Sequence, residues 1–388
     1  METLRTLETV GKQKLALLGM GTVGSAVAAM IDQSTLAELT HVFRRANKVL
    51  DARDTSDFST ILHDASVMTV IETLGGDQPA KDFLVQALKS GKNVVTSNKT
   101  VVARNFDLLV RAANEGGSRL FIEATCGGAV PWINALMRAR RLEPISQFSG
   151  VMNGTTNFMI EQMRTNGCSF DSALRQAQER GYAEADPTAD IDGIDTAAKV
   201  VISARVAFRA RTPTVFPRSG IRALTREDVD MLASYGLVPR LVGTGVTDGQ
   251  RFAVAVELSA VGAESPFATL PDNLNTLVLV QPHSGMLAFT GQGAGGKPTA
   301  SAVMHDVLDA ALGESSEYEV NEHLRYDPSL LIGDYVFRSP QAPGGYEVER
   351  DMSAEDALRH AFERSEGGLP AFISAIPKGA LGDLPGRC

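Results

Sequence analysis

Residues 14–32 read KLALLGMGTVGSAVAAMID and contain three glycines at the spacing GxGxxG. The apolar run 14–18 predicts a buried strand, and the Ala- and Val-rich run 22–32 predicts a helix. Gly19 then allows the tight turn, Gly21 lets backbone approach a pyrophosphate, and Gly24 permits close packing of the helix on the strand. The N–H groups of the helix N-terminus favour a phosphate. The stretch predicts a dinucleotide site that also includes Thr22 and Val23, and the alternative is a glycine-rich packing turn.

Short apolar runs alternate with helical patterns through the first third of the chain. Strands are predicted at 40–43, 67–71, 93–96 and 119–123, and helices at 79–90, 105–115 and from about Pro131. The helix from Pro79 to Ser90 has proline at its first position and Gly91 as its stop. Strands separated by helices of this length indicate parallel βαβ units. The predicted fold class is therefore α/β, with a Rossmann-type doubly wound domain.

After about residue 144 the pattern changes. A strand at 147–152, a helix at 194–208 and several β-like runs within 237–290 predict a second, mixed α/β domain. A glycine-rich turn beginning at residue 291 leads into an amphipathic helix that ends near 312. Residues 313–388 form a C-terminal extension of unknown role, in which DYVFRS, AEDALRHAFERS and AFISAI predict one small βαβ-like piece. The expected domains are thus 1–144, 145–284 and 313–388.

The composition is that of an ordinary globular protein. The chain has 388 residues, 44% of them hydrophobic, and a formal net charge of -9, which disfavours a general nucleic-acid or anionic-membrane binder. Its three cysteines form no CxxC pair, so we expect neither a disulfide framework nor a zinc cage, and a cytoplasmic location. The sequence has no signal-peptide pattern and no run of eighteen apolar residues, so no membrane segment is expected.

The end of the second strand indicates which cofactor is preferred. NAD-preferring sites place an acidic residue there to hold the ribose 2′-hydroxyl. In this chain Arg44 and Arg45 follow the strand, and no carboxylate occurs before Asp51. Guanidinium groups suit a 2′-phosphate, so the sequence favours NADP, with NAD as the alternative.

Residues 181–199, GYAEADPTADIDGIDTAAK, hold five acids within twelve residues, and Lys199 follows them. Asp195 and Lys199 are i and i+4 on a predicted apolar helix, so they share one face and are close enough to interact. A carboxylate beside a lysine in a partly dry cleft suits ammonium recognition and proton transfer. The stretch is not predicted to bind calcium, because it lacks the twelve-residue pattern of a calcium-binding loop. An ordinary acidic first turn of a helix remains an alternative.

Two further turns carry polar groups suited to a small molecule. Asn153, Gly154 and Thr155 follow the strand at 147–152, although simple turn chemistry explains them equally well. The strand at 93–96 leads to Ser97, Asn98 and Lys99 in a loop at the carboxyl end of the sheet, where open α/β sheets bind ligands. A lysine there can donate to an oxygen or relay a proton, although a solvated surface lysine is the commoner case.

Seven stretches, in order, resemble homoserine dehydrogenase. They are GMGTVG (19–24), ETLGG (72–76), GKNVVTSNK (91–99), EATCGGAVP (123–131), GVMNGTTNF (150–158), GYAEADPTADIDGIDTAAK (181–199) and GQGAGGKPTASAV (291–303). The resemblance implies NAD(P)-linked interconversion of L-homoserine and L-aspartate 4-semialdehyde, on the path to threonine and methionine. It also implies a homodimer, a substrate-binding and dimerisation domain at 145–284, and a segment 285–312 that completes the nucleotide domain.

The resemblance assigns roles to residues by their match to these motifs. Lys99 and Lys199 match the catalytic lysines, and Asp195 matches the carboxylate one turn before the second lysine. The implied substrate residues are Glu184, Asp190, Asn153, Gly154 and Thr155; further cofactor residues are Gly75, Gly76, Ser97, Asn98 and Gly293. A monovalent cation, Na⁺ or K⁺, is implied at the backbone carbonyls of Glu123, Cys126, Gly128 and Val130.

Two residues depart from the family pattern. Cys126 stands where a small aliphatic residue is usual, and Trp132 stands where Ile or Val is common. A thiol is the nucleophile of phosphorylating semialdehyde dehydrogenases, but no histidine lies near Cys126 in sequence. Trp132 leaves open a divergent dehydrogenase of another amino alcohol. A catalytically silent cofactor-binding homologue is the third alternative. The tail shows no ACT pattern, so threonine feedback is not expected.

Overall fold

A computed structural model describes residues 12–49, 51–314, 318–319, 323–365, 371–381 and 386–387. The chain divides into two compact units. The first unit is Met1–Asn134 with Ala294–Glu319, and the second is Ala135–Gly293 with Val320–Cys388. The sequence analysis placed the domain boundaries at residues 144 and 284, whereas the chain divides after Asn134 and after Gly293. It also treated residues 313–388 as a separate extension, whereas the residues from Val320 onward are grouped with the second unit.

The first unit contains the doubly wound sheet that the sequence predicted. Its six strands are all parallel, in the order β3-β2-β1-β4-β5-β6. The strands are β1 (Gln13–Leu18), β2 (Ala37–Phe43), β3 (Asp54–Thr55), β4 (Thr69–Glu72), β5 (Asn93–Thr96) and β6 (Leu120–Phe121). The helices are α2 (Thr22–Asp32), α3 (Phe58–His63), α4 (Ala80–Lys89), α5 (Lys99–Gly116) and α12 (Gly296–Leu312), with short 3₁₀ turns η1 (Ala46–Lys48) and η2 (Glu123–Thr125). The α/β fold class is thereby confirmed.

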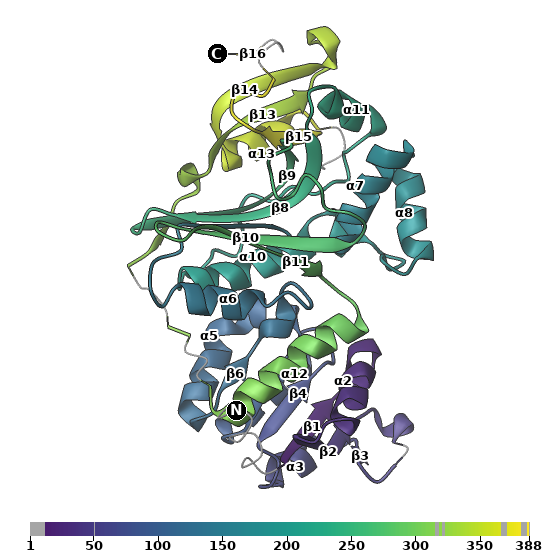
Figure 1. Cartoon of the computed structure of the whole chain (residues 1–388), viewed down its shortest axis with the longest axis vertical. Coiled ribbons are helices and arrows are strands. Elements are labelled where there is room, and N and C mark those ends of the chain that lie inside the picture. Colours follow the sequence, from purple (N-terminus) through teal and green to yellow (C-terminus); the bar gives the residue numbers. More distant parts are fainter. Residues whose placement is uncertain are drawn as a thin grey trace. The chain divides into compact units, whose positions relative to one another are not determined.

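Helices α2 and α12 lie side by side in the first unit (Figure 1). The buried positions of α2 are Gly24, Val27, Ala28 and Ile31, which form one stripe at helical spacing. Of these residues, Val27, Ala28 and Ile31 belong to the same apolar cluster as Val303 and other residues of α12. The core of the unit therefore joins the start of the chain to a helix near residue 300.

Two helix boundaries differ from the sequence prediction. Helix α5 begins at Lys99, six residues before the predicted start, because the side chain of Asn98 caps it and accepts from Val101 N. Lys99 therefore opens the helix, while Ser97 and Asn98 form the short loop between β5 and α5. Helix α4 begins one residue after Pro79, which is the N-cap, and ends at Lys89 before Gly91 turns with φ +83°.

The second unit is built on one mixed sheet, in the order β11-β10-β7-β8-β9-β15-β13-β14-β16, with β12 paired to β9. Its main strands are β7 (Gln147–Val151), β8 (Val238–Thr247), β9 (Arg251–Val261), β10 (Leu274–Gln281) and β11 (Gly285–Gln292). Its helices include α7 (Gly154–Asn166), α8 (Phe170–Glu179), α9 (Thr188–Ile191), α10 (Ile194–Ala207) and α11 (Arg226–Ser234). Helix α6 (Trp132–Ala139) follows Pro131. Helix α10 packs closely on β8, where a Cβ on Gly243 would lie 2.5 Å from Val200.

The C-terminal tail extends this sheet beyond β9 (Figure 1). Its elements are β12 (Arg325–Tyr326), η3 (Pro328–Leu330), β13 (Ile332–Arg338), η4 (Pro343–Gly345), β14 (Tyr346–Ser353), α13 (Ala354–Glu363), β15 (Ile373–Ile376) and β16 (Gly386–Arg387). Strand β13 is antiparallel to both β14 and β15, so α13 joins two parallel strands that have β13 between them. The predicted βαβ-like piece therefore consists of β14, α13 and β15. The DYVFRS run, which was expected to be its first strand, forms β13 and lies between β14 and β15.

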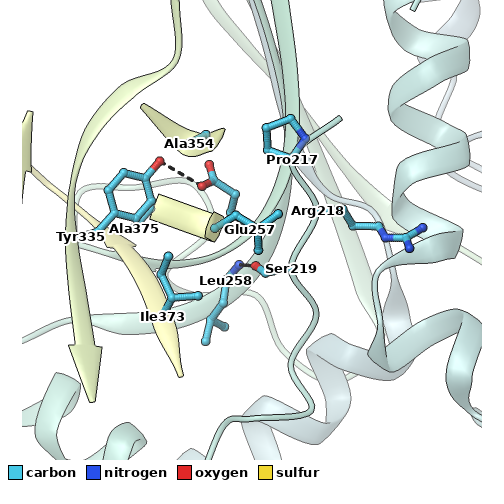
Figure 2. Close-up of a pocket in the computed structure, with 10 residues that line it drawn as sticks. Pro217, Arg218, Ser219, Glu257, Leu258, Tyr335, Ala354, Ile373 and Ala375 are labelled. Carbon is cyan, nitrogen blue, oxygen red and sulfur yellow. Dashed lines mark hydrogen bonds between the residues drawn. The ribbon is translucent and has the colours of Figure 1, made fainter. Parts of the chain in front are cut away.

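A polar contact fastens the tail to β9. The hydroxyl of Tyr335 on β13 donates to Oε1 of Glu257 on β9 at 2.9 Å, beside a void of about 10 Å³ (Figure 2). Enclosure of this carboxyl group raises the pKa of Glu257 to about 7. No helix within the described residues is both long and apolar enough to cross a bilayer.

Candidate functional site

The glycine turn after β1 has the geometry that a pyrophosphate requires. Gly19 has φ +98°, a conformation that favours glycine. A Cβ on Gly24 would lie 2.3 Å from the Gly19 carbonyl oxygen, whereas a Cβ on Gly21 would have no neighbour within 4 Å. Gly21 is the N-cap of α2 and no side chain caps the helix there. The close turn, the open second glycine and the uncapped helix start all fit a dinucleotide.

The carboxyl end of β2 is basic, and one of its two arginines is already paired. Nε of Arg44 lies 2.9 Å from Oδ1 of Asp54, whose side chain is completely buried. Arg45 follows in extended backbone, exposed, as the N-cap of the 3₁₀ turn η1. Arg44 is therefore already engaged by the carboxylate of Asp54. Of the two arginines, Arg45 is the better placed to bind an additional anion.

The carboxyl ends of β4 and β5 meet at a buried acid, Glu72. Gly75 and Gly76 turn the chain after β4 with φ +74° and +71°, and the space around both is open. Asn98 donates from Nδ2 to the Gly76 carbonyl at 2.7 Å and to Glu72 Oε1 at 3.3 Å. Ser97 and Lys99 lie on either side of Asn98 and are half-buried.

In the second unit, Lys199 and Asp195 form the ion pair expected from their spacing. Nζ of Lys199 lies 2.8 Å from Oδ2 of Asp195 and donates to the Met152 carbonyl at 2.5 Å. Both side chains are buried, with 8% exposed. A lysine held by a carboxylate and a carbonyl has a fixed position from which to exchange a proton.

Asn153 connects this pair to a second carboxylate. Its Nδ2 donates to Asp190 Oδ1 at 2.7 Å and to Asp195 Oδ2 at 2.9 Å. Burial raises the pKa of Asp190, while the hydrogen bond from Asn153 acts in the opposite direction. Asn153 also caps α7, which begins at Gly154, and Thr155 donates to the Tyr182 carbonyl at 2.7 Å. The turn and the acidic stretch that the sequence singled out therefore meet.

The other acids of 181–199 have different surroundings. Glu184 is exposed after α8, and its backbone carbonyl accepts from Gln178. Asp192 forms a two-point ion pair with Arg222, at 2.8 and 2.9 Å. Asp186 caps the turn that leads into α9 through Thr188 N. Spacing alone could not separate Asp190, which belongs to the buried network, from these neighbours.

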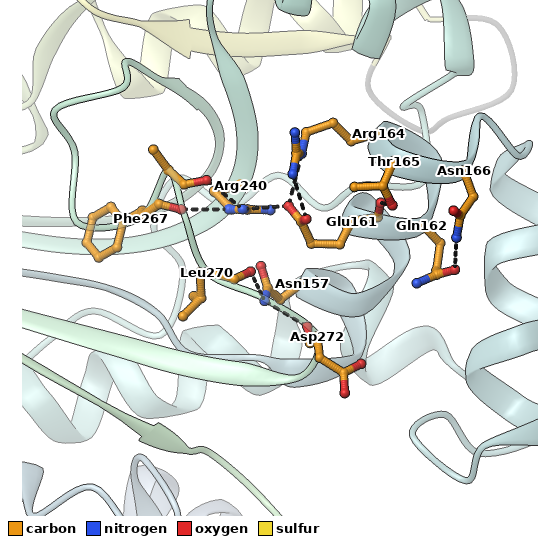
Figure 3. A network of polar contacts seen from close by, with 11 residues as sticks. Asn157, Glu161, Gln162, Arg164, Thr165, Asn166, Arg240, Phe267, Leu270 and Asp272 are labelled. Atoms are coloured by element: carbon orange, nitrogen blue, oxygen red, sulfur yellow. Dashed lines mark hydrogen bonds and ion pairs between the residues drawn. The ribbon is translucent and has the colours of Figure 1, made fainter.

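Helix α7, which carries Asn153 at its start, is anchored by a buried polar network (Figure 3). Glu161 lies 2.6 Å from Nη2 of Arg240, whose side chain is completely buried. Asn157 donates from Nδ2 to the carbonyls of Leu270 and Asp272 at 3.1 and 2.9 Å. These contacts fix the position of α7, and with it the direction of the Asn153 side chain.

The stretch 123–131 is a buried turn. The Glu123 carboxylate accepts from Ile133 N and Asn134 N at 2.9 and 2.7 Å, and burial raises its pKa to about 7. The carbonyls of Glu123 and Val130 each accept one backbone N–H, which leaves a second lone pair on each oxygen. Gly128 turns the chain with φ +59°. Carbonyl oxygens of this kind suit a monovalent cation, and no group of three or more His, Cys, Asp or Glu side chains that would hold a metal occurs among the described residues.

The two departures from the family pattern are both buried. Cys126 is 1% exposed, with Thr125 Oγ1 at 3.8 Å from its sulfur. Trp132 is fully buried at the start of α6. A catalytic thiol needs access to its substrate, and the thiol of Cys126 is buried.

Sequence reasoning missed two polar side chains. Glu72 was quoted within a motif but given no role. Asn275 on β10 donates from Nδ2 to the same Met152 carbonyl that Lys199 contacts, at 2.9 Å, and its Oδ1 has no partner in the described part of the chain. Gly293 packs against Asn275, since a Cβ there would lie 2.0 Å from the amide. This close packing explains why a glycine is required at position 293 without any contact to a cofactor.

Comparisons with known proteins agree with this geometry. A family model described as "Homoserine dehydrogenase, NAD binding domain" matches residues 19–123, and one described as "Homoserine dehydrogenase" matches residues 131–308. The homoserine dehydrogenase of Bacillus subtilis is 32% identical over 380 residues, which cover 94% of this chain and 84% of that protein. The homoserine dehydrogenase of Lactococcus lactis is 30% identical, with 93% and 91% covered.

Solved structures give the same result. A homoserine dehydrogenase from Staphylococcus aureus superposes with a TM-score of 0.74 at 27% identity, covering 95% of this chain and all of that one. One from Thiobacillus denitrificans has a TM-score of 0.76 at 28% identity, with 84% and 81% covered. A hyperthermophilic archaeal homoserine dehydrogenase mutant in complex with NADPH has a TM-score of 0.69 at 25% identity, with 78% and 99% covered.

Proposed function

The chain belongs to the homoserine dehydrogenase family, and we propose how its own residues carry out the family's reaction. The reaction is the NAD(P)-dependent interconversion of L-homoserine and L-aspartate 4-semialdehyde, an oxidation or reduction at a CH–OH group. The observation that carries the assignment of residues is the buried network of Lys199, Asp195, Asn153 and Asp190.

The nucleotide is held at the turn after β1. Gly19, Gly21 and Gly24, with Thr22 and Val23, form the pyrophosphate cradle at the start of α2. The loop at Gly75 and Gly76, with Ser97 and Asn98, lines the neighbouring strand ends. When bound, the nicotinamide cofactor supplies the hydride acceptor or donor.

NADP is the preferred cofactor in this proposal. Arg44 engages Asp54, an acid beside the end of β2 whose other carboxylate oxygen accepts from Asp51 N. Arg45 then offers a guanidinium group to a 2′-phosphate, which suits NADP better than NAD. NAD remains the alternative cofactor.

The substrate is recognised by its charged groups. Asp190, oriented by Asn153, binds the ammonium group of the amino acid, with Glu184 as a second acid in the same stretch. Gly154 and Thr155 form the turn beside it. A buried carboxylate fixed by an amide discriminates strongly, because the site is left unpaired when the substrate lacks an ammonium group.

Lys199 handles the proton of the substrate hydroxyl. Its position is fixed by Asp195 and by the Met152 carbonyl. In the oxidation of homoserine the amine form of Lys199 accepts the hydroxyl proton on Nζ, and in the reverse direction the resulting ammonium group returns that proton to the carbonyl oxygen. Lys99, at the start of α5, is the second catalytic lysine of this proposal.

The proposal includes further features, some implied by the resemblance and some by the composition. Na⁺ or K⁺ is held by the carbonyls of Glu123, Cys126, Gly128 and Val130, as a clip on the turn and not as a redox centre. The protein acts as a homodimer, in the cytoplasm, on the path to threonine and methionine. Its partner in catalysis is a small molecule, and no nucleic acid or membrane is involved. Gly293 is retained as a cofactor-loop residue.

The test is absorbance at 340 nm with purified protein, L-homoserine, and NADP or NAD in parallel at alkaline pH. We expect the wild-type protein to reduce the cofactor when L-homoserine is present, and to reduce NADP in preference to NAD. Other amino alcohols, such as L-serine and 3-aminopropanol, form the control panel. Faster turnover of one of these would indicate a divergent dehydrogenase, and bound cofactor without turnover of any would indicate a silent homologue.

A further inference from the structure

Glu72 is a buried carboxylate at the junction of two strand ends. It is the last residue of β4, which lies between β1 and β5 in the sheet. Its side chain is fully buried. Oε1 accepts from Leu74 N at 2.7 Å, from Gly75 N at 3.4 Å and from Asn98 Nδ2 at 3.3 Å, while Thr96 Oγ1 lies 2.5 Å from Oε2.

These contacts connect two segments that are far apart in sequence. On one side is the loop after β4, with its two left-handed glycines. On the other is the start of α5, where Thr96 Oγ1 accepts from Asn98 N at 3.0 Å and Asn98 caps the helix that Lys99 begins. A single carboxylate therefore sets the position of the loop and the start of the helix together.

A stabilising role alone does not explain an acid at this position. Moving a carboxylate out of water is unfavourable unless several donors compensate for it, and burial raises the pKa of Glu72 against the effect of its hydrogen bonds. None of the ion pairs in the described residues involves Glu72. What the acid supplies is acceptor geometry, because both oxygens are used at fixed angles by groups of two segments.

We infer that Glu72 is a positioning residue for the cofactor, which holds the loop 73–76 and the start of α5 in the arrangement that binds the nicotinamide nucleotide and directs Lys99. This inference rests on the proposed function for the identity of the ligand. Glu72 acts through the backbone of Leu74 and Gly75 and through Asn98, and it does not itself take part in proton transfer.

Two substitutions separate the parts of this role. Glu72→Ala removes every acceptor at once. Glu72→Gln keeps Oε1 for Leu74, Gly75 and Asn98, and its amide can donate to Thr96 Oγ1, so it is the conservative variant. Thr96→Val removes only the hydroxyl link to Oε2 and to Asn98 N, and it serves if Glu72→Ala does not fold.

Glu143 offers a matched control in the second unit. It is buried, and its carboxylate also accepts from two consecutive backbone amides, His283 N at 2.8 Å and Ser284 N at 3.1 Å, and from the Ser284 hydroxyl. Glu143→Ala therefore removes the same kind of contact from a turn that is not part of the proposed nucleotide site.

The experiment measures NADPH binding by titration calorimetry, without substrate, followed by kcat and KM with L-homoserine. We expect Glu72→Ala to raise the Kd for NADPH at least tenfold and to lower kcat, with the KM for homoserine within about twofold of wild type. Glu72→Gln should recover most of the affinity, and Thr96→Val should raise Kd about threefold. Glu143→Ala should lower the melting temperature and leave Kd unchanged.

Glu72 has only a structural role if Glu72→Ala and Glu143→Ala lose equal stability while both keep the wild-type Kd for NADPH. If Glu72→Ala does not fold, a Kd for NADPH in Thr96→Val that equals the wild-type value would overturn the inference in the same way. A wild-type protein that binds no nicotinamide nucleotide would also overturn it. A wild-type protein that binds NADPH but does not oxidise homoserine contradicts the proposed function alone, because the Kd comparison still decides the role of Glu72.

Discussion

Nζ of Lys199 lies 2.8 Å from Oδ2 of Asp195, one helical turn earlier on α10, and both side chains are buried. An isolated buried pair contributes little net stability, because desolvation offsets the attraction. Here the same Asp195 oxygen also accepts from Asn153, and the lysine also donates to Met152. The arrangement is therefore better suited to holding a proton donor in place than to stabilising the fold.

Replacing Lys199 should abolish most turnover. We expect Lys199→Ala to lower kcat by roughly 10²–10⁴-fold, the range for loss of general acid–base catalysis, with a smaller change in the KM for homoserine. Initial rates at 340 nm measure both. Lys92→Met is the matched control, since Lys92 is a buried lysine that donates to the carbonyls of Asp64 and Val67. Near-normal turnover in Lys199→Ala would refute the assignment.

Asp190 should govern the acidic side of the pH profile. Burial raises its pKa above the ordinary value, and only the ionised form attracts an ammonium group. As pH falls through this raised pKa, kcat/KM for homoserine should fall, at a higher pH than for an ordinary aspartate. Asp190→Asn should remove this limb and raise KM at least about tenfold, as expected when an ion pair with the substrate is lost. Asp192→Asn, which breaks the pair with Arg222, should keep the wild-type profile.

Arg45 should determine the choice between the two nicotinamide cofactors. We expect Arg45→Ala to raise the KM for NADP roughly tenfold, the loss of one charge-assisted hydrogen bond, and to leave the KM for NAD unchanged. Arg53→Ala provides the control, because Arg53 is exposed and pairs with Asp32 and Asp51. An equal effect of Arg45→Ala on both cofactors would show that the arginine does not contact a 2′-phosphate.

Cys126 should be dispensable for catalysis. The thiol is buried beside Thr125, and oxidation of an alcohol through a nicotinamide cofactor needs no covalent intermediate. Cys126→Ala should therefore retain kcat within about twofold, measured by the same 340 nm assay. Loss of activity in this variant, together with formation of a thioester on the wild-type protein, would favour the thiol-dependent class.

Glu257 should make the stability of the second unit depend on pH. Its folded pKa is raised to about 7, from 4.5. The stability that the protonated form contributes is complete below about pH 4.5 and is lost as pH rises through 7. In Glu257→Gln the amide oxygen still accepts from Tyr335, and this pH dependence should disappear. Thermal unfolding at pH 5.5 and 8.5 should show the variant gaining roughly 1–2 kcal/mol relative to wild type at the higher pH. A constant difference between the two proteins would contradict this.

The extent to which sequence predicted structure varies with the range of the interactions. Helix α2 was predicted with its observed bounds, because the glycine turn and the apolar stripe are local signals. The position of β15 beside β9 was not predicted, because the pairing of Ala375 with Ser259 joins residues far apart in the chain. Glu72 was missed for a related reason, since nothing in ETLGG indicates that its donors include Thr96 and Asn98.

The packing of α12 against α2 also has a consequence for biosynthesis. Leu15 and Val27 share one apolar cluster with Val303 and Val307, so the nucleotide unit cannot bury its interior until residue 307 has left the ribosome. Contacts of such long range make folding slow and leave the nascent chain open to aggregation. The emerging N-terminal strands should therefore depend on chaperones while the whole stretch between the two helices is translated.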